Sequence, residues 1–170
     1  MNDEQLNNAI KSVGVTVSAA KEICLSTMQQ SKDHRWYAER SKRVTASVFG
    51  KIINRRKSLY PKSLIQSITK QHNPAVKAPT PLQWGLDNES KAIKKYEEIP
   101  KRDETVRSCG FVVSPKWPWL GCSPDGIVMR NGVPEGCIEI KCPYASKDLC
   151  ISDAVNCKKK TFVYNKLKMV

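Results

Sequence analysis

The chain has 170 residues, with 29 Lys and Arg against 16 Asp and Glu, and a formal net charge of +13. A hydrophobic fraction of 40% and four Trp predict one folded domain with a sizeable core. No run approaches about 18 apolar residues, which excludes a helical membrane span, and no basic-then-apolar leader follows Met1, which argues against secretion.

Seven cysteines are spread over the chain without a CxxC pair. Their odd number and the missing leader predict reduced thiols in an intracellular protein, nuclear or cytoplasmic. A zinc site is the alternative for the last four cysteines, although zinc-binding knuckles favour closer spacing. These four are Cys137, Cys142, Cys150 and Cys157.

The positive charge is unevenly distributed. Residues 40–77 contain ten Lys and Arg and no acid, and residues 141–170 contain seven bases and two acids. Residues 78–140 are nearly neutral, with nine acids and eight bases. A basic flank beside an acid-bearing centre favours an enzyme that binds phosphates and holds a metal ion, whereas a solvated basic face is the alternative.

Residues 1–31 are polar and mixed, and we interpret them as an accessory N-terminal segment. Within it, Ala19–Gln29 has a loose helical spacing of apolar residues. No side chain there indicates chemistry, so the segment is an accessory helix or a lead-in. The functional domain is then expected to comprise residues 32–170.

Residues 33–53 predict two helices. The first covers residues 36–40, and the second covers Ala46–Ile53 with Thr45 as its N-cap. A stripe of apolar side chains on the second helix is expected to be buried. This stripe consists of Val48, Phe49, Ile52 and Ile53.

The N-terminus of this second helix is a candidate phosphate-binding site. Helix N-termini offer free backbone N–H groups to anions. Arg40, Arg43 and Ser47 are close to it in sequence and would add side-chain donors. Ordinary capping beside surface arginines is the alternative.

A short helix is predicted at residues 63–69, and a longer one within Leu82–Ile99, capped by Asp87 or Asn88. On the longer helix, Glu89 lies four residues before Ile93 and seven before Tyr96. The three therefore share the inward face. An inward carboxylate requires a partner, unless it is only a first-turn Glu that favours the helix dipole.

Residues 109–140 predict three strands. Cys109–Val113 is one, and Trp117 and Trp119 follow it, where either ring could stack on a base or pack at the rim of the core. The other two are residues 126–129 and 137–140, and Asn131-Gly132 between them predicts a hairpin turn.

Three charged residues accompany this hairpin. Asp125 precedes its first strand, and Glu139 and Lys141 are two apart, which predicts that both leave the same face of its second strand. Charges on an apolar hairpin cost desolvation free energy unless something compensates. A divalent cation held by Asp125 and Glu139 would compensate, and oxygen ligands suit Mg²⁺ or Mn²⁺. Beyond the hairpin we expect a helix at 146–156 and a strand at 162–164.

Four motifs together resemble one family. They are Arg40-x-x-Arg43-Val-Thr-Ala-Ser47, Trp84-Gly85-x-x-x-Glu89, Gly121-Cys-Ser-Pro-Asp-Gly126 and Glu139-Ile-Lys-Cys-Pro143. The chain resembles the YqaJ-type viral recombinase, or lambda phage exonuclease, family of the PD-(D/E)xK nuclease superfamily over residues 35–144. This resemblance implies an α/β fold with a restriction-endonuclease-like core, which is a short mixed sheet flanked by helices.

The resemblance also implies roles for individual residues. Asp125, Glu139 and the Ile140 carbonyl would hold the principal Mg²⁺ or Mn²⁺, and Glu89 a second ion or its water. Lys141 would orient the attacking water or stabilise the transition state. Arg40, Ser47 and Ser123 would anchor a terminal 5′-phosphate.

The implied function is a metal-dependent 5′-to-3′ exonuclease that acts on linear duplex DNA in recombination or end resection. By resemblance it would form a homo-oligomer and work with an annealing or recombinase protein. An endonuclease on the same core is one alternative. Another is a DNA-end-binding relative with weak or no catalysis, because the C-terminal Tyr/Gln motif of the family is missing and the domain is expected to be truncated there.

Overall fold

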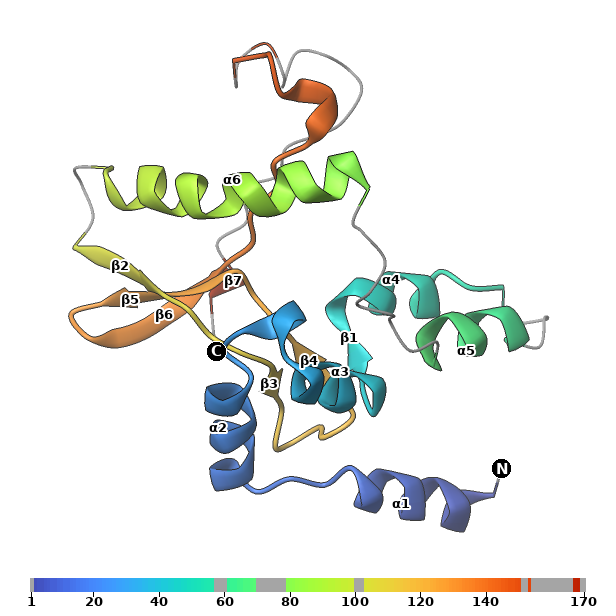
Figure 1. Cartoon of the computed structure of the whole chain (residues 1–170). Helices are drawn as coiled ribbons and strands as arrows, with labels where there is room; N and C mark the ends of the chain where they lie inside the picture. Colours follow the sequence, from blue (N-terminus) through green and yellow to red (C-terminus); the bar gives the residue numbers. More distant parts are fainter. Residues whose placement is uncertain are drawn as a thin grey trace. The chain divides into compact units, whose positions relative to one another are not determined.

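The structure is a computed structural model, and it describes residues 2–56, 61–69, 79–99, 103–150, 153 and 167–168. The chain forms two compact units that alternate along the sequence (Figure 1). The first unit consists of Met1–Pro74 and Cys109–Ser123, and the second of Ala75–Ser108 and Pro124–Val170. The domain boundary predicted at residue 32 stays a prediction.

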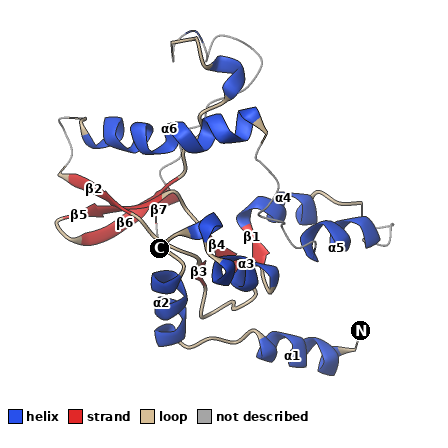
Figure 2. Ribbon diagram, in the orientation of Figure 1, coloured by secondary structure: helices blue, strands red, loops and turns tan. Residues whose placement is uncertain are grey.

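The first unit combines helices with a short mixed sheet (Figure 2). Its strand β1 pairs in parallel with β4, and β4 pairs antiparallel with β3. Its helices include those predicted at residues 36–40, 46–53 and 63–69, which are confirmed. The elements are α1 (Asp3–Ser12), α2 (Val17–Ser26), η1 (Gln30–Lys32), α3 (His34–Ser41), β1 (Val44–Thr45), α4 (Ala46–Ile53), α5 (Lys62–Thr69), β3 (Val112–Val113) and β4 (Leu120–Cys122).

The core of the first unit lies between α2 and β3. Ala20 and Ile23 of α2 pack against Phe111, which is fully buried, and against Val113. The helix expected in the accessory segment therefore supplies half of this core. Its loose apolar spacing predicted a helix but not that the helix packs against β3.

A buried hydroxyl attaches the end of α2 to β3. The Thr27 Oγ1 donates to the Ile23 carbonyl at 2.6 Å and accepts from the Phe111 N–H at 2.8 Å. Gly110 allows this approach, because a Cβ there would overlap the Cys24 carbonyl and the Thr27 side chain.

The second unit is an antiparallel sheet with one long helix, α6, packed against it (Figure 1). Tyr96 of α6 forms a core cluster with Val128 and Ile138 of the sheet. The strand order is β2-β5-β6-β7. The elements are α6 (Thr80–Glu97), β2 (Glu104–Arg107), β5 (Gly126–Arg130), β6 (Val133–Ile138), η2 (Tyr144–Ser146) and β7 (Leu167–Lys168).

The predicted hairpin is confirmed as β5 and β6. Asn131 and Gly132 connect the strands with φ angles of +50° and +78°. Two successive positive φ angles match the right-handed twist of the strands, which is why Asn-Gly is favoured in such turns.

Several local predictions are wrong. Helix α6 begins at Thr80 rather than at Asp87 or Asn88, because Pro79 and Pro81 fix the start of the helix. The helix predicted at residues 146–156 does not form at residues 147–150, which follow a short 3₁₀ turn at 144–146. Asp153 is helical, and residues 151–152 and 154–156 lie outside the described part of the chain. The strand predicted at Cys109–Val113 is shorter than expected, because only Val112–Val113 form β3.

The expected buried stripe of α4 is also wrong, because Phe49 and Ile53 are exposed and the other two residues are only half-buried. Other predicted features lie outside the described residues. These are Cys157 of the alternative zinc site and the strand at 162–164.

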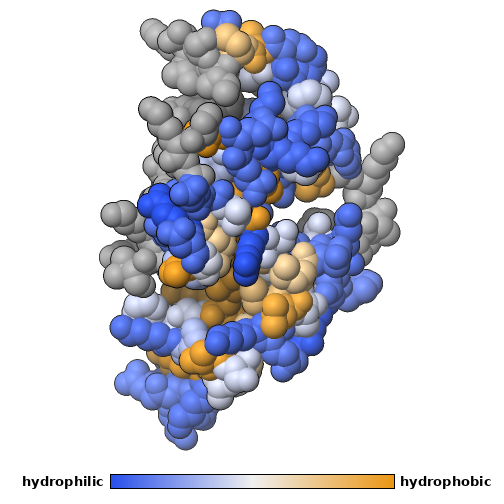
Figure 3. Space-filling view, turned by 90° about the vertical axis from the view of Figure 1, so that its left-hand side faces the viewer, coloured by the Kyte–Doolittle hydropathy of each residue, from blue (hydrophilic) through white to orange (hydrophobic). Residues whose placement is uncertain are grey.

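The described surface is mostly hydrophilic on the face drawn in Figure 3. Among the described residues, no helix is both long and apolar enough to cross a membrane.

The Thr27 hydroxyl provides a test of the first unit. Thr27→Val keeps the side-chain volume but leaves the buried Phe111 N–H without its acceptor, so we expect a loss of about 1–3 kcal/mol in the free energy of unfolding. Urea denaturation measures it. Thr27→Ser keeps the hydroxyl and should lose no more than about 1 kcal/mol. Equal losses in both variants would contradict the role of the hydrogen bond.

Candidate functional site

Asp125 is held at the mouth of the β5–β6 hairpin by two backbone contacts. Its N–H donates to the Ile138 carbonyl at 3.1 Å. Its Oδ2 accepts a short hydrogen bond from the Ile140 N–H. The carboxylate is therefore fixed to the segment that carries Glu139 and Lys141.

Glu139 and Lys141 do not lie on β6, because the strand ends at Ile138. Both side chains are more than half exposed, and the Lys141 Nζ donates a short hydrogen bond to the Glu139 Oε1. The prediction that they share one side is confirmed by this contact. The prediction that the strand carries them is wrong, because β6 pairs with β5 only up to Ile138. Beyond it, the Ile140 N–H donates to the Asp125 carboxylate instead of to a backbone carbonyl of β5.

Glu89 joins these residues from α6. Glu89 and Ile93 are half-buried and Tyr96 is buried, which confirms the shared face. Burial raises the pKa of Glu89 above its usual range, and the negative charges of Asp125 and Glu139 raise it further, while Lys141 acts against them. The side chain expected to need a partner therefore faces two other acids.

The same physics applies to Asp125. Burial raises the pKa of Asp125, and the Glu139 charge adds to the rise, while the Ile140 N–H and Lys141 oppose it. Three carboxylates and one ammonium thus interact electrostatically in the second unit. We call Glu89, Asp125, Glu139 and Lys141 the carboxylate cluster.

The donor chemistry of the carboxylate cluster suits a hard divalent cation. Burial raises the pKa of Glu89 and of Asp125, and the Glu139 charge adds to both rises, so added positive charge stabilises these carboxylates. However, within the described part of the chain, no three His, Cys, Asp or Glu side chains are grouped so that they could hold a metal ion together. This also applies to Cys137, Cys142 and Cys150 of the alternative zinc site.

A second group of polar side chains lies in the first unit, on α3, α4 and the end of β4. The Arg40 Nη1 lies 3.4 Å from the Ser123 Oγ, and its Nη2 lies 3.4 Å from the Ser47 Oγ. Trp36 donates from Nε1 to the Ser123 Oγ at 2.8 Å. The structure therefore brings together three residues that the sequence predicted for phosphate binding, and we call them with Trp36 the hydroxyl–guanidinium group.

The charge of Arg40 has no acidic partner here. In the described residues no carboxylate lies within salt-bridge distance of it, and its guanidinium instead stacks 4.1 Å above the centre of the Trp36 ring. Burial lowers the pKa of Arg40, although an arginine stays charged. A half-buried cation between two hydroxyls is suited to bind an anion.

Hydrogen-bond accounting at Ser123 supports this interpretation. A hydroxyl has two acceptor positions and one proton to donate. Trp36 and Arg40 donate to both acceptor positions of the Ser123 Oγ. No described residue accepts its proton, which is therefore available to an anion.

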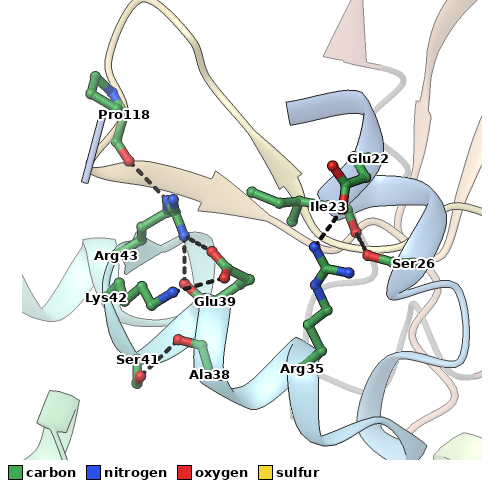
Figure 4. A network of polar contacts seen from close by, with 10 residues as sticks. All are labelled: Glu22, Ile23, Ser26, Arg35, Ala38, Glu39, Ser41, Lys42, Arg43 and Pro118. Carbon is green, nitrogen blue, oxygen red and sulfur yellow. Dashed lines mark hydrogen bonds and ion pairs between the residues drawn. The ribbon is translucent and has the colours of Figure 1, made fainter. Parts of the chain in front are cut away.

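Arg43 does not belong to this group, which corrects its predicted role in phosphate binding. Its side chain is only 2% exposed. As Figure 4 shows, it donates to the Pro118 carbonyl at 2.9 Å and to the Glu39 carboxylate at 2.5 Å. Arg43 thus attaches α3 to the segment that precedes β4, and its charge is balanced by Glu39.

Sequence reasoning missed Trp36 as part of the group. Trp36 lies four residues before Arg40, a spacing that places both on one helix face. That spacing was the available signal, but it does not reveal the contact with Ser123, which is 87 residues away.

Comparisons with known proteins identify a family and a similar solved structure. The family model of the YqaJ-like viral recombinase domain matches residues 35–156. The alkaline exonuclease LHK-Exo of Laribacter hongkongensis is similar, with 26% identity and a TM-score of 0.52 over 75% of this chain. The match covers 62% of that protein, so this chain spans less than two thirds of its length.

A second structure of LHK-Exo, in complex with dAMP, matches with 28% identity and a TM-score of 0.49, over 72% of this chain and 60% of that one. No curated protein matches. The family match and the exonuclease structure confirm the expected resemblance and the mixed α/β fold class.

The electrostatic repulsion at Glu89 can be tested by thermal stability, without an activity assay. Because the pKa of Glu89 is raised, its ionisation destabilises the folded chain as pH rises from about 4.5 through the raised pKa. In EDTA at pH 7.5, Glu89→Gln should therefore raise the melting temperature by roughly 1–3 °C. This gain should vanish below about pH 4, where Glu is protonated in both states.

Asp87→Asn is the matched control, because Asp87 is exposed on the same helix and Asn keeps the acceptor for Gln83. The difference between its melting temperature and that of the wild type should be small at both pH values. A gain for Glu89→Gln that is independent of pH would contradict the electrostatic explanation.

Proposed function

This chain belongs to the family of the YqaJ-like viral recombinase domain, and we propose that it is a metal-dependent deoxyribonuclease that degrades linear duplex DNA from 5′ ends. The observation that carries the proposal is the carboxylate cluster, in which burial and neighbouring negative charge raise the pKa of Glu89 and Asp125 beside a single lysine. The formal charge of +13 is consistent with a polyanionic substrate.

In this proposal, Asp125, Glu139 and the Ile140 carbonyl hold Mg²⁺ or Mn²⁺, and Glu89 holds a second ion or its water. The bound metal would lower the pKa of a water molecule and shield the scissile phosphate. Asp125 needs no rearrangement of its backbone, because two hydrogen bonds already fix it. Glu139 has to exchange its contact with Lys141 for the cation.

Lys141 is the positively charged side chain of the carboxylate cluster. Released from Glu139, its ammonium can orient the attacking water or stabilise the negative charge of the transition state. Its exposure of 70% leaves it accessible to a substrate phosphate. Partial burial of Asp125 and Glu89 strengthens these interactions.

The hydroxyl–guanidinium group gives the proposed enzyme its preference for ends. Ser123 keeps a hydroxyl proton that no described residue accepts, and Arg40 adds a positive charge without an acidic partner among the described residues. Both suit the dianionic phosphate of a 5′ terminus better than an internal phosphodiester. This preference distinguishes an exonuclease from an endonuclease on the same fold.

A DNA-end-binding protein without turnover is the second candidate. It is favoured by the absence, among the described residues, of three grouped side chains that could hold a metal ion. In either case we place the protein in recombination or end resection, and we propose a homo-oligomer with an annealing or recombinase protein as partner.

The cleavage assay uses linear duplex DNA in Mg²⁺ and in EDTA, with closed circular DNA as a control substrate. We expect release of nucleotides from linear DNA in Mg²⁺ alone, and a rate about 10²–10³-fold lower in Lys141→Ala. Lys94→Ala, an exposed lysine of α6, should cleave normally. Binding without cleavage by the wild type would favour the second candidate, and normal cleavage by Lys141→Ala would contradict the assignment of the site.

The preference for ends is tested by comparing duplexes with and without a 5′-phosphate. Arg40→Ala should reduce the ratio of the two rates about tenfold or more, because a charged hydrogen bond is removed. Arg35→Ala is the matched control, since Arg35 lies on the same helix and pairs with Glu22 at the surface. An unchanged ratio in Arg40→Ala would disprove the phosphate assignment.

A further inference from the structure

The loop between β3 and β4, residues 114–119, presents two indole rings to solvent. Trp117 is 47% exposed and Trp119 is 36% exposed, whereas Pro118 between them is buried. Large aromatic side chains are favoured in cores and at binding sites. This loop is separate from the hydroxyl–guanidinium group, and nothing in the proposed mechanism uses it.

Hydrogen bonds hold the backbone of this loop firmly. The Trp117 N–H donates to the Ser114 Oγ at 3.1 Å, and the Trp117 carbonyl accepts from the Leu120 N–H at 2.8 Å. Arg43 donates to the Pro118 carbonyl at 2.9 Å, as seen in Figure 4. The Trp119 carbonyl accepts from the Val44 N–H at 2.8 Å.

This anchoring has a consequence for binding. A ring on a mobile loop loses conformational entropy when a partner orders it, whereas a ring on a fixed backbone loses little. Pro115 and Pro118 restrict the backbone of the loop further. The loop therefore presents Trp117 in a form that is already organised for contact.

The charge around Trp117 indicates the class of partner. The Lys116 Nζ lies 4.7 Å from the centre of the Trp117 ring. Residues 105–124 contain no Asp or Glu, and their charged residues are Arg107 and Lys116. A flat ring beside an ammonium matches a nucleotide, whose base stacks while its phosphate carries negative charge.

We infer that Trp117 is a stacking platform for an unpaired base of single-stranded DNA, with Lys116 contacting a phosphate of the same strand. The inference rests on the proposed function for its substrate class, because removal of one strand of a duplex leaves the other single-stranded. Stacking tolerates any base, so the platform contributes affinity without sequence preference.

The test measures binding in EDTA, where cleavage is not required. Fluorescence anisotropy compares a labelled oligothymidine with a blunt duplex of the same length. Trp117→Ala should weaken oligothymidine binding about tenfold, and Trp117→Phe, which keeps a ring, about threefold or less. Lys116→Ala should reduce the slope of the logarithm of the binding constant against the logarithm of salt concentration by about one, the value for one lost phosphate contact. Blunt-duplex affinity should change less than about twofold in Trp117→Ala.

Phe49→Ala is the matched control, because Phe49 is an aromatic residue of the same unit with the same 47% exposure. It should bind both DNAs like the wild type. Equal losses in Phe49→Ala and Trp117→Ala would overturn the inference, since general loss of apolar surface would then explain both. Unchanged oligothymidine binding in Trp117→Ala and Trp117→Phe would also overturn it and favour a protein partner for the ring.

Failure of the stacking platform and failure of the exonuclease proposal give different results. A wild-type protein that binds oligothymidine through Trp117 but cuts no DNA in Mg²⁺ would overturn the exonuclease and support the platform. A wild-type protein that cuts DNA while Trp117→Ala keeps full affinity for oligothymidine would overturn the platform alone.

Discussion

Repulsion among three acids is the constraint on which the second unit depends. Burial raises the pKa values of Glu89 and Asp125, and the negative charge of neighbouring acids raises both further. Such an arrangement persists only where the surrounding structure fixes it. Backbone hydrogen bonds from the end of β6 fix Asp125, and packing of α6 on the sheet fixes Glu89.

Tyr96 shows how this packing is secured two turns away from Glu89. Its ring lies in the core with Val128 and Ile138, and its hydroxyl donates to the Glu104 Oε2 at 2.6 Å. Arg130 binds the other oxygen of Glu104 at 2.7 Å. This buried acid is fully paired and stabilises the helix position, whereas the acids of the carboxylate cluster share one lysine. Pairing therefore separates this structural carboxylate from those that we propose to be functional.

The sequence predicted the local elements well and the distant contacts poorly. Asn131-Gly132 fixed the hairpin because its turn geometry is a property of those two residues. The inward position of Glu89 followed from helical spacing alone. In contrast, Arg43 looked like a phosphate ligand because its motif is basic, and only the fold shows Glu39 and the Pro118 carbonyl beside it. Trp36 was missed for the same reason, since its partner Ser123 is remote in sequence.

The carboxylate cluster and the hydroxyl–guanidinium group, our two candidate sites, have opposite and unbalanced charge. The carboxylate cluster has three acids and one ammonium, and the hydroxyl–guanidinium group has one guanidinium without an acid. A fold selected for stability alone would pair such charges within each unit, as it does at Glu104 and Arg43. Among the described residues, no acid pairs with Arg40 and no second base joins the carboxylate cluster, which favours a bound cation for one group and a bound anion for the other. A DNA end with its metal ions carries both, which is why the pattern of unpaired charge, more than any single residue, favours a nuclease.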